Sequence, residues 1–181
     1  NPRDAFGVAQ CYLGQSINTG NLEDWDKAIE VLKEQNHLVS SYVMDEIFNK
    51  MENGEAALAP YYAGDFLTMH DVNPDLAFVY PKEGVNFFVD AMCVPKNAEN
   101  KEAAELYINF MLEEKIAVAN ANYICYATPH SNVLESDDYD LKGEPVLYPD
   151  EENTPRTEMF ENLDYETQNY MNMLWNELKI E

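Results

Sequence analysis

One stretch of the sequence decides which fold we expect for this chain: Tyr80-Pro-Lys-Glu-Gly-Val-Asn-Phe-Phe-Val-Asp-Ala-Met-Cys-Val-Pro-Lys-Asn-Ala-Glu-Asn-Lys101. Its apolar run, 87–94, is typical of a buried strand, and that run contains a single carboxylate, Asp90. Side chains alternate across a strand, so Phe88 and Asp90 are expected on the same side. The run ends at Pro95, and a turn then leads into an amphipathic helix.

A carboxylate in an apolar strand is costly to bury unless it is paired or hydrogen-bonded. One explanation for Asp90 is a structural salt bridge or a capping contact. The other is an ammonium-binding carboxylate beside the aromatic face of Phe88, where a cation–π contact contributes roughly 0.5–2 kcal/mol. The residues alone leave both explanations open.

The charge balance narrows the class of partner. The chain has 181 residues, enough for one domain or one and a half, and its 11 basic and 34 acidic residues give a net charge of −23. Nucleic-acid binding needs clustered Lys and Arg, so we expect no nucleic-acid partner. We also expect no membrane insertion, because no apolar run approaches the roughly 18 residues of a spanning helix. A cationic ligand or a basic protein partner suits this field, although the acidity is equally explained as a solubility coat.

Metal and cofactor chemistry has no support in the sequence. The three cysteines (Cys11, Cys93, Cys125) form no CxxC motif, and the three histidines are not at ligand spacing. We therefore expect free, buried thiols, no metal and no cofactor. The start, Asn1-Pro2-Arg3, is typical of a helix opening and not of a natural N-terminus. We expect a piece of a longer protein, for which a missing targeting signal carries no information on location.

The hydrophobic pattern alternates between helices and strands. A first helix is predicted from Pro2 with an apolar face of Ala5, Val8, Ala9, Tyr12 and Leu13, and a second after the cap Asn21 with Trp25, Ala28, Ile29 and Leu32. Further helices are expected at 44–52, from Ala63, at 101–112, up to about 122, and at 164–178. Strands are expected at 38–43, 56–62, 76–80 and 87–94, with an irregular segment at 135–162. This order favours an α/β fold with mostly parallel pairing.

Three further residues are candidates for a binding site. Tyr62 ends a predicted strand just before a helix, where ligands of open α/β sheets bind, although a Tyr pair is also ordinary core. Tyr126 lies at an expected crossing of the chain, just before Thr128-Pro129, where regular secondary structure is expected to end. Asp4 lies in the first turn of a helix, where a carboxylate is favoured for helical reasons alone. Asp4 and Asp90 could in principle form a carboxylate pair for acid–base chemistry. The sequence has no catalytic motif, however, so we expect no catalytic residue and no enzyme.

Several segments together resemble the periplasmic spermidine/putrescine-binding proteins, the polyamine receptors of ABC importers. They are Tyr80-Pro81-Lys82-Glu83-Gly84, Asp90-Ala91, Val94-Pro95 through Glu102, Tyr107 to Leu112, Tyr126-Ala127-Thr128-Pro129, and Leu147-Tyr148-Pro149-Asp150. The resemblance covers essentially the whole chain and matches the later half or so of a full-length member.

The resemblance implies the type II periplasmic-binding-protein fold, an α/β fold of two lobes joined by crossing segments with the ligand in a cleft. It assigns 1–84 to part of the second lobe, 85–127 to a crossing segment of the first lobe, and 128–181 to the return into the second lobe with its C-terminal helix. The body of the first lobe is then absent. Without it, we expect 85–127 to be exposed, rearranged or held by a neighbouring copy.

The resemblance also implies roles for individual residues. Asp90 matches the family's ammonium-binding aspartate and Tyr126 a cleft tyrosine. Phe88 and Tyr62 stand where tryptophans are common, and Asp4 where a glutamate is common. Two further positions depart from the pattern: Asn1 replaces a common aspartate and Phe160 a common glutamine.

The function implied is a receptor that binds putrescine or spermidine and delivers it to a membrane permease. It would be periplasmic or extracellular and associated with the membrane through its parent protein. The departures keep open a related receptor for another organic cation, a metal ion or a phosphonate, and they favour a diamine among polyamines. A hydrolase using Asp4 and Asp90 and a purely structural role are the alternatives of other classes.

Overall fold

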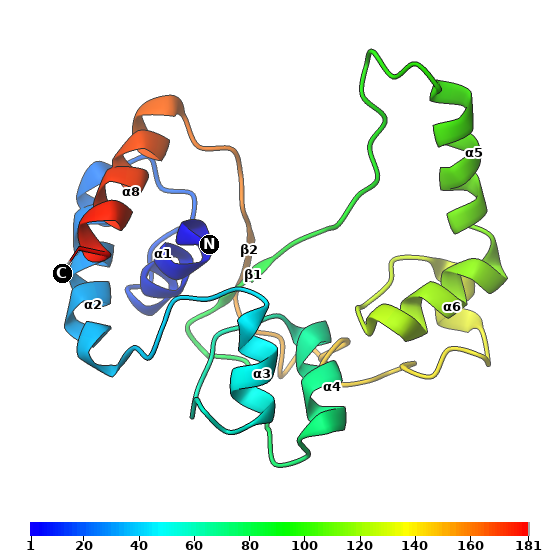
Figure 1. Ribbon diagram of the computed structural model, residues 1–181, viewed down its shortest axis with the longest axis horizontal. Helices are drawn as coiled ribbons and strands as arrows, with labels where there is room; N and C mark the ends of the chain where they lie inside the picture. Colours follow the sequence, from blue (N-terminus) through cyan, green and yellow to red (C-terminus); the bar gives the residue numbers. More distant parts are fainter. Residues whose placement is uncertain (181) are drawn as a thin grey trace. The chain divides into compact units, whose positions relative to one another are not determined.

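The computed structural model describes residues 1–180 and is mostly helical (Figure 1). Its elements are α1 (Pro2–Tyr12), α2 (Leu22–Gln35), the short 3-10 helix η1 (Asn36–Leu38), α3 (Glu46–Glu52), α4 (Ala63–Val72), β1 (Val85–Phe87), α5 (Lys101–Met111), α6 (Glu114–Ile124), α7 (Ser131–Glu135), β2 (Thr157–Met159) and α8 (Tyr165–Leu178).

The chain divides into two compact units. Unit 1 comprises Asn1–Pro60, Val79–Phe88 and the described chain from Asn153 onward, and unit 2 comprises Tyr61–Phe78 and Val89–Glu152. These boundaries do not test the assignment of 1–84, 85–127 and 128–181 to the lobes of a larger protein, which stays a prediction.

The core of unit 1 lies between α1, α2 and α8. Phe6 makes an edge contact with Trp25 at 5.3 Å between ring centroids, and Trp175 lies 6.5 Å from Phe6 on its other flank. The predicted stripe of α2 is confirmed, because Trp25, Ala28, Ile29 and Leu32 are all buried. The predicted helix at 164–178 is present as α8, which buries Met171, Leu174 and Leu178. Large aromatic and aliphatic side chains thus hold α1 and α2 together with α8, which is distant from them in sequence.

Helix α1 is predicted correctly, but its buried face is not. The buried residues of α1 are Phe6, Gly7, Ala9 and Gln10, whereas Tyr12 of the predicted face is 67% exposed. The reason is packing: Phe6 fits between two tryptophans, and the helix turns that residue inward. The caps agree with expectation, since Asn1 accepts from the Arg3 N–H and Asn21 from the Glu23 N–H.

Most of the predicted strands are wrong. The runs 38–43, 56–62 and 76–80 have no strand structure, and the run 87–94 is in a strand only at Phe87. Their apolar side chains are largely exposed, with Leu58 at 88% and Val79 at 78%. A strand needs a neighbour to pair its backbone groups, and among the described residues only β1 and β2 pair. Asp90 therefore lies on exposed, irregular backbone and not on a buried strand.

The observed sheet is a parallel pair, as expected for the pairing direction, with Val85 opposite Thr157 and Phe87 opposite Met159. The sequence gives no pattern for β2, which falls in the segment predicted to be irregular. Glu158 of β2 fastens the pair to the loop after α1. Its carboxylate accepts hydrogen bonds from the Ser16 hydroxyl, the Ile17 N–H, the Asn18 amide and the Arg156 guanidinium.

Gly84, the last residue of the Tyr-Pro-Lys-Glu-Gly segment, allows β1 and β2 to lie close together. Its φ of +128° is a conformation that side chains rarely adopt, and an added Cβ would lie 2.9 Å from the Arg156 carbonyl oxygen. The next residue, Val85, donates its N–H to that same oxygen at 2.9 Å. The glycine is thus required where the first bond of the ladder forms.

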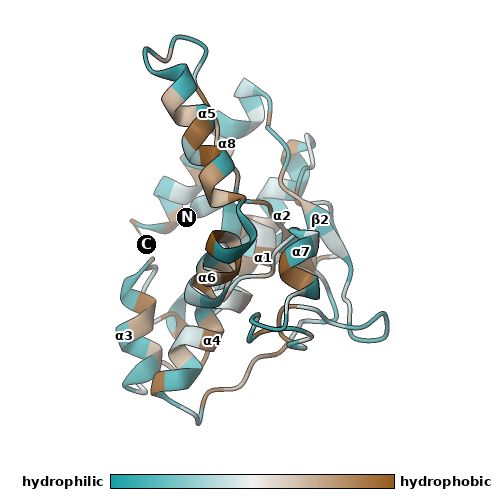
Figure 2. Cartoon of the chain, turned by 90° about the vertical axis from the view of Figure 1, so that its right-hand side faces the viewer, coloured by the Kyte–Doolittle hydropathy of each residue, from teal (hydrophilic) through white to brown (hydrophobic). Residues whose placement is uncertain are grey.

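Unit 2 has a smaller core of Val118, Ala121, Val133 and Tyr139. Helix α5 is present as predicted but has no buried residue. Figure 2 colours part of this helix as hydrophobic, and its residues Leu106, Tyr107 and Phe110 are exposed. The expectation that 85–127 is exposed, rearranged or held by a neighbouring copy stays a prediction, since α6 within this region buries Val118 and Ala121. All three cysteines are free; burial was wrongly predicted for Cys93, which is exposed, while Cys11 and Cys125 are half-buried.

Replacing Gly84 by alanine is expected to destabilise the chain by about 1–3 kcal/mol, because the φ is unfavourable for alanine and the Cβ meets a carbonyl oxygen. Urea unfolding measures the change. Gly20→Ala is the matched control, since a Cβ there meets nothing within 4 Å and its φ is not positive. Equal stabilities of the two variants would contradict the role given to Gly84.

The Glu158 carboxylate predicts a pH dependence of stability. Partial burial acts to raise its pKa, but hydrogen bonds from Ser16, Arg156 and Ile17 outweigh it, so the pKa lies below the ordinary 4.5. A lowered folded-state pKa stabilises the fold above the ordinary value, and this stabilisation is lost as the pH falls through the folded-state pKa.

Glu158→Gln is therefore expected to cost about 1–3 kcal/mol at neutral pH, with the difference from the unsubstituted chain shrinking below about pH 4.5. Urea unfolding from pH 7 down to pH 3 checks this expectation. A difference that is independent of pH would show that the charge of Glu158 contributes nothing.

Candidate functional site

The start of α4 and the end of α6 meet in unit 2 through Gly64 and Tyr126. Gly64 is buried, and an added Cβ would lie 2.3 Å from Cδ2 of the Tyr126 ring. Cys125, with a left-handed φ of 57°, ends α6 immediately before Tyr126. The absence of a side chain at Gly64 therefore allows the tyrosine ring to lie directly on the helix backbone.

The Tyr126 hydroxyl lies in an acidic environment. Burial is the largest cause that raises the pKa of Tyr126 strongly, followed by the charge of Asp65 and a hydrogen bond with the Asp65 side chain. Tyr61 and Asp90 also raise the pKa of Tyr126 through their charges. The phenol is thus held protonated and donates to Asp65, and two carboxylates act on one hydroxyl.

A pair of tyrosines borders the same neighbourhood. The rings of Tyr61 and Tyr62 lie 4.9 Å apart, tilted by 45°, and both residues are half-buried just before α4. Unit 2 thus brings together three aromatic rings and two carboxylates. Such a set matches an organic cation, since carboxylates bind ammonium groups and π faces cover methylene groups.

The predicted site residues divide between the units. Asp90, Tyr126 and Tyr62 lie in unit 2, and the charge of Asp90 contributes to raising the pKa of Tyr126. Asp4, in the first turn of α1, and Phe88, just after β1, lie in unit 1. Asp4 is close enough to Arg3 for its charge to act on the guanidinium.

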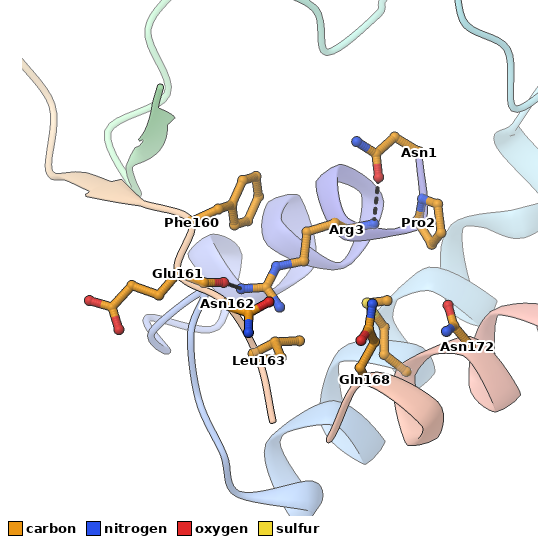
Figure 3. Close-up of a pocket in the computed structure, with 10 residues that line it drawn as sticks. Asn1, Pro2, Arg3, Phe160, Glu161, Asn162, Leu163, Gln168 and Asn172 are labelled. Atoms are coloured by element: carbon orange, nitrogen blue, oxygen red, sulfur yellow. Dashed lines mark hydrogen bonds between the residues drawn. The ribbon is translucent and has the colours of Figure 1, made fainter. Parts of the chain in front are cut away.

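Unit 1 has a groove of its own, of about 340 Å³, beside the first turn of α1 (Figure 3). The Arg3 guanidinium lies 4.9 Å from the centre of the Phe160 ring and 5.8 Å from that of Trp25. It donates to Asn18 Oδ1 at 2.8 Å and to the Glu161 carbonyl oxygen at 3.4 Å. Burial lowers the pKa of Arg3, and the charge of Asp4 acts in the opposite direction. This groove presents a fixed cation and several side-chain amides.

Sequence reasoning missed Asp65 and Tyr61 as members of the unit 2 site. An acidic residue in the first turn of a helix is common for helical reasons, so Asp65 is not distinguished by its position in the sequence. The available signal was the short spacing in Tyr61-Tyr62-Ala63-Gly64-Asp65, with a glycine that a helix start does not otherwise need. No group of three or more metal-ligating side chains occurs within residues 1–180.

Comparison with known proteins identifies the family. Residues 3–154 match the family described as bacterial extracellular solute-binding protein. The chain belongs to this family. The spermidine/putrescine-binding periplasmic protein of Salmonella typhimurium is 31% identical over 86% of this chain and 45% of its own length. The putrescine/cadaverine-binding protein of Pseudomonas aeruginosa is 25% identical over 99% of this chain and 52% of its own.

Solved structures of the solute-binding family give the fold. A putative spermidine/putrescine ABC transporter from Listeria monocytogenes superposes with a TM-score of 0.90 at 32% identity, over 99% of this chain and 55% of that one. The substrate-binding protein PotD of Streptococcus pneumoniae gives a TM-score of 0.81 at 27% identity, over 99% and 56%. The chain spans about half the length of the relatives it matches. It has part of the type II periplasmic-binding-protein fold, mostly helical with a small parallel sheet.

Membership of this family bears on two of the expectations from the sequence. It is a family of solute-binding proteins and not of enzymes, and its members are extracellular or periplasmic, as predicted. In the part of the chain that the structure describes, no helix has the length and apolar character needed to cross a membrane.

Replacing Gly64 by alanine is expected to displace Tyr126, since a Cβ at 2.3 Å from its ring cannot be accommodated without a shift. The phenol then loses Asp65 as an acceptor. Near-ultraviolet circular dichroism of Gly64→Ala should change in the tyrosine region, and Gly20→Ala should not alter it. An unchanged spectrum for Gly64→Ala would contradict the close packing.

Proposed function

We propose that this chain is part of a polyamine receptor of an ABC importer, binding putrescine or spermidine and delivering it to a membrane permease. The observation that carries the proposal is the cluster in unit 2, where Asp65 and Asp90 both act on Tyr126 beside the Tyr61–Tyr62 pair. Relatives named for binding spermidine, putrescine or cadaverine support the same ligand class.

Binding replaces the hydration shell of an ammonium group by carboxylate oxygens. Asp90, which is exposed, is the carboxylate we assign to the ligand, whereas Asp65 accepts from Tyr126. The rings of Tyr62 and Tyr126 then cover the methylene chain, each contributing roughly 0.5–2 kcal/mol through its π face. Asp4 and Phe88 stay predictions as ligand-binding residues of unit 1.

The finer architecture belongs to the same proposal. Residues 1–84 form part of the second lobe, 85–127 the crossing segment of the first lobe, and 128–181 the return, with the first-lobe body supplied by residues outside this sequence. The exposed apolar face of α5 supports this division, since Leu106, Tyr107 and Phe110 are exposed large hydrophobic residues. The receptor is associated with the membrane through its parent protein.

A diamine suits this chain better than a triamine. Asn1 stands where the family commonly has an aspartate, so this chain has one carboxylate fewer. Close by, the Arg3 guanidinium lies 4.9 Å from the centre of the Phe160 ring. We therefore place putrescine ahead of spermidine.

Isothermal titration calorimetry on the full-length receptor tests the proposal. Putrescine is expected to bind more tightly than spermidine. The absence of heat with either amine at millimolar concentration would refute polyamine binding. A thermal-shift panel of other organic cations, metal ions and phosphonates then identifies the alternative solute, because only a bound ligand stabilises the fold.

Asp90→Asn is expected to weaken putrescine binding by about 2 kcal/mol or more, roughly a 30-fold rise in Kd, because the ammonium loses its charged partner. Asp71→Asn, an exposed aspartate at the end of α4, is the matched control and should leave the Kd unchanged. Equal dissociation constants for the two variants would remove Asp90 from the site.

A further inference from the structure

The loop that carries Tyr126 is held two residues further on. The Thr128 N–H donates to the hydroxyl oxygen of Tyr148 at 3.0 Å, although the two residues are 20 positions apart. The same Tyr148 hydroxyl lies 2.9 Å from the hydroxyl of Tyr139. A hydroxyl has one proton and two lone pairs, so Tyr148 can accept from Thr128 and still share a hydrogen bond with Tyr139.

Tyr139 gives this chain of hydrogen bonds a rigid base. It is 3% exposed and packs in the core of unit 2. The side-chain amide of Asn122, in α6, bonds to the residues on both sides of Tyr139. It donates to the Asp138 carbonyl oxygen at 2.9 Å and accepts from the Asp140 N–H at 3.0 Å. Burial raises the pKa of Tyr139 strongly, and its hydrogen bond with Tyr148 adds to the effect, so the hydroxyl keeps its proton.

The loop is fastened at its far end as well. The Thr128 hydroxyl oxygen accepts from the His130 N–H at 3.2 Å, and the ring Nε2 of His130 lies 3.0 Å from the Leu112 carbonyl oxygen. The segment after Tyr126 is thus bonded to the loop after α5 and to Tyr148. The Tyr148 bond joins Thr128 to the core of unit 2, through Tyr139.

We propose that Tyr148, supported by Tyr139, is a positioning residue for ligand binding: it fixes the Thr128 backbone and thereby holds Tyr126 against Gly64 and Asp65. This inference rests on the proposed function and deepens it. Neither hydroxyl needs to touch the ligand. The consequence is that the affinity of the receptor depends on a hydroxyl group 22 residues from Tyr126 in the sequence.

The first test is independent of any ligand. Hydrogen–deuterium exchange of the 181-residue chain is expected to accelerate about fivefold or more over 126–130 in Tyr148→Phe, because the Thr128 N–H loses its acceptor. Tyr170→Phe is the matched control, since its hydroxyl makes a comparable hydrogen bond to Asp26, at 2.5 Å, in unit 1. Unchanged exchange over 126–130 in Tyr148→Phe would overturn the inference, whether or not polyamines bind.

The second test is a double-mutant cycle on putrescine affinity in the full-length receptor. Tyr148→Phe is expected to raise the Kd about fivefold, and to have no further effect in a Tyr126→Ala background. A general loss of stability would not depend on Tyr126 in this way. Additive effects, or a Kd equal to that of the unsubstituted receptor, would overturn the inference. Absence of putrescine binding by the unsubstituted receptor refutes the proposed function and leaves the exchange experiment to decide the positioning of Tyr126.

Discussion

The contact of Tyr126 with the start of α4 is the interaction on which the candidate site of unit 2 depends. The ring lies on Gly64, and its hydroxyl donates to Asp65 while Asp90 acts on it electrostatically. A hydroxyl bonded to a carboxylate is anchored, and the two residues are brought together from α4 and from the end of α6, 61 positions apart. The site is therefore a property of the folded unit and not of any one motif.

The helices of this chain follow from local rules, and the strands do not. Trp25, Ala28, Ile29 and Leu32 recur at helical spacing after the cap Asn21, and the structure buries all four. The apolar runs at 56–62 and 87–94 have equally clear composition, yet only Phe87 of these residues lies in a strand. Helices satisfy their backbone hydrogen bonds within the segment, whereas a strand depends on a neighbour that the sequence pattern does not specify.

Part of the candidate site could also be predicted from the sequence. Asp90 and Tyr126 could be selected as a carboxylate and an aromatic residue in segments resembling a known family, and the structure brings them into electrostatic reach. Asp65 was overlooked because a helix start explains an acidic residue without reference to any partner. The face of α1 was misjudged because the size of Phe6, fitted between two tryptophans, outweighs the periodicity of smaller residues.

Net charge and local chemistry act at different ranges in this molecule. The charge of −23 attracts any cation, but it cannot distinguish one amine from another. Selectivity requires fixed groups, such as the carboxylates around Tyr126 in unit 2.

A crystal structure of the full-length receptor with putrescine tests the central claim most directly. The account predicts an ammonium nitrogen within hydrogen-bonding distance of an Asp90 carboxylate oxygen, with the methylene chain against the ring of Tyr126. Putrescine bound elsewhere, with Asp90 facing solvent and Tyr126 without ligand contact, would contradict it.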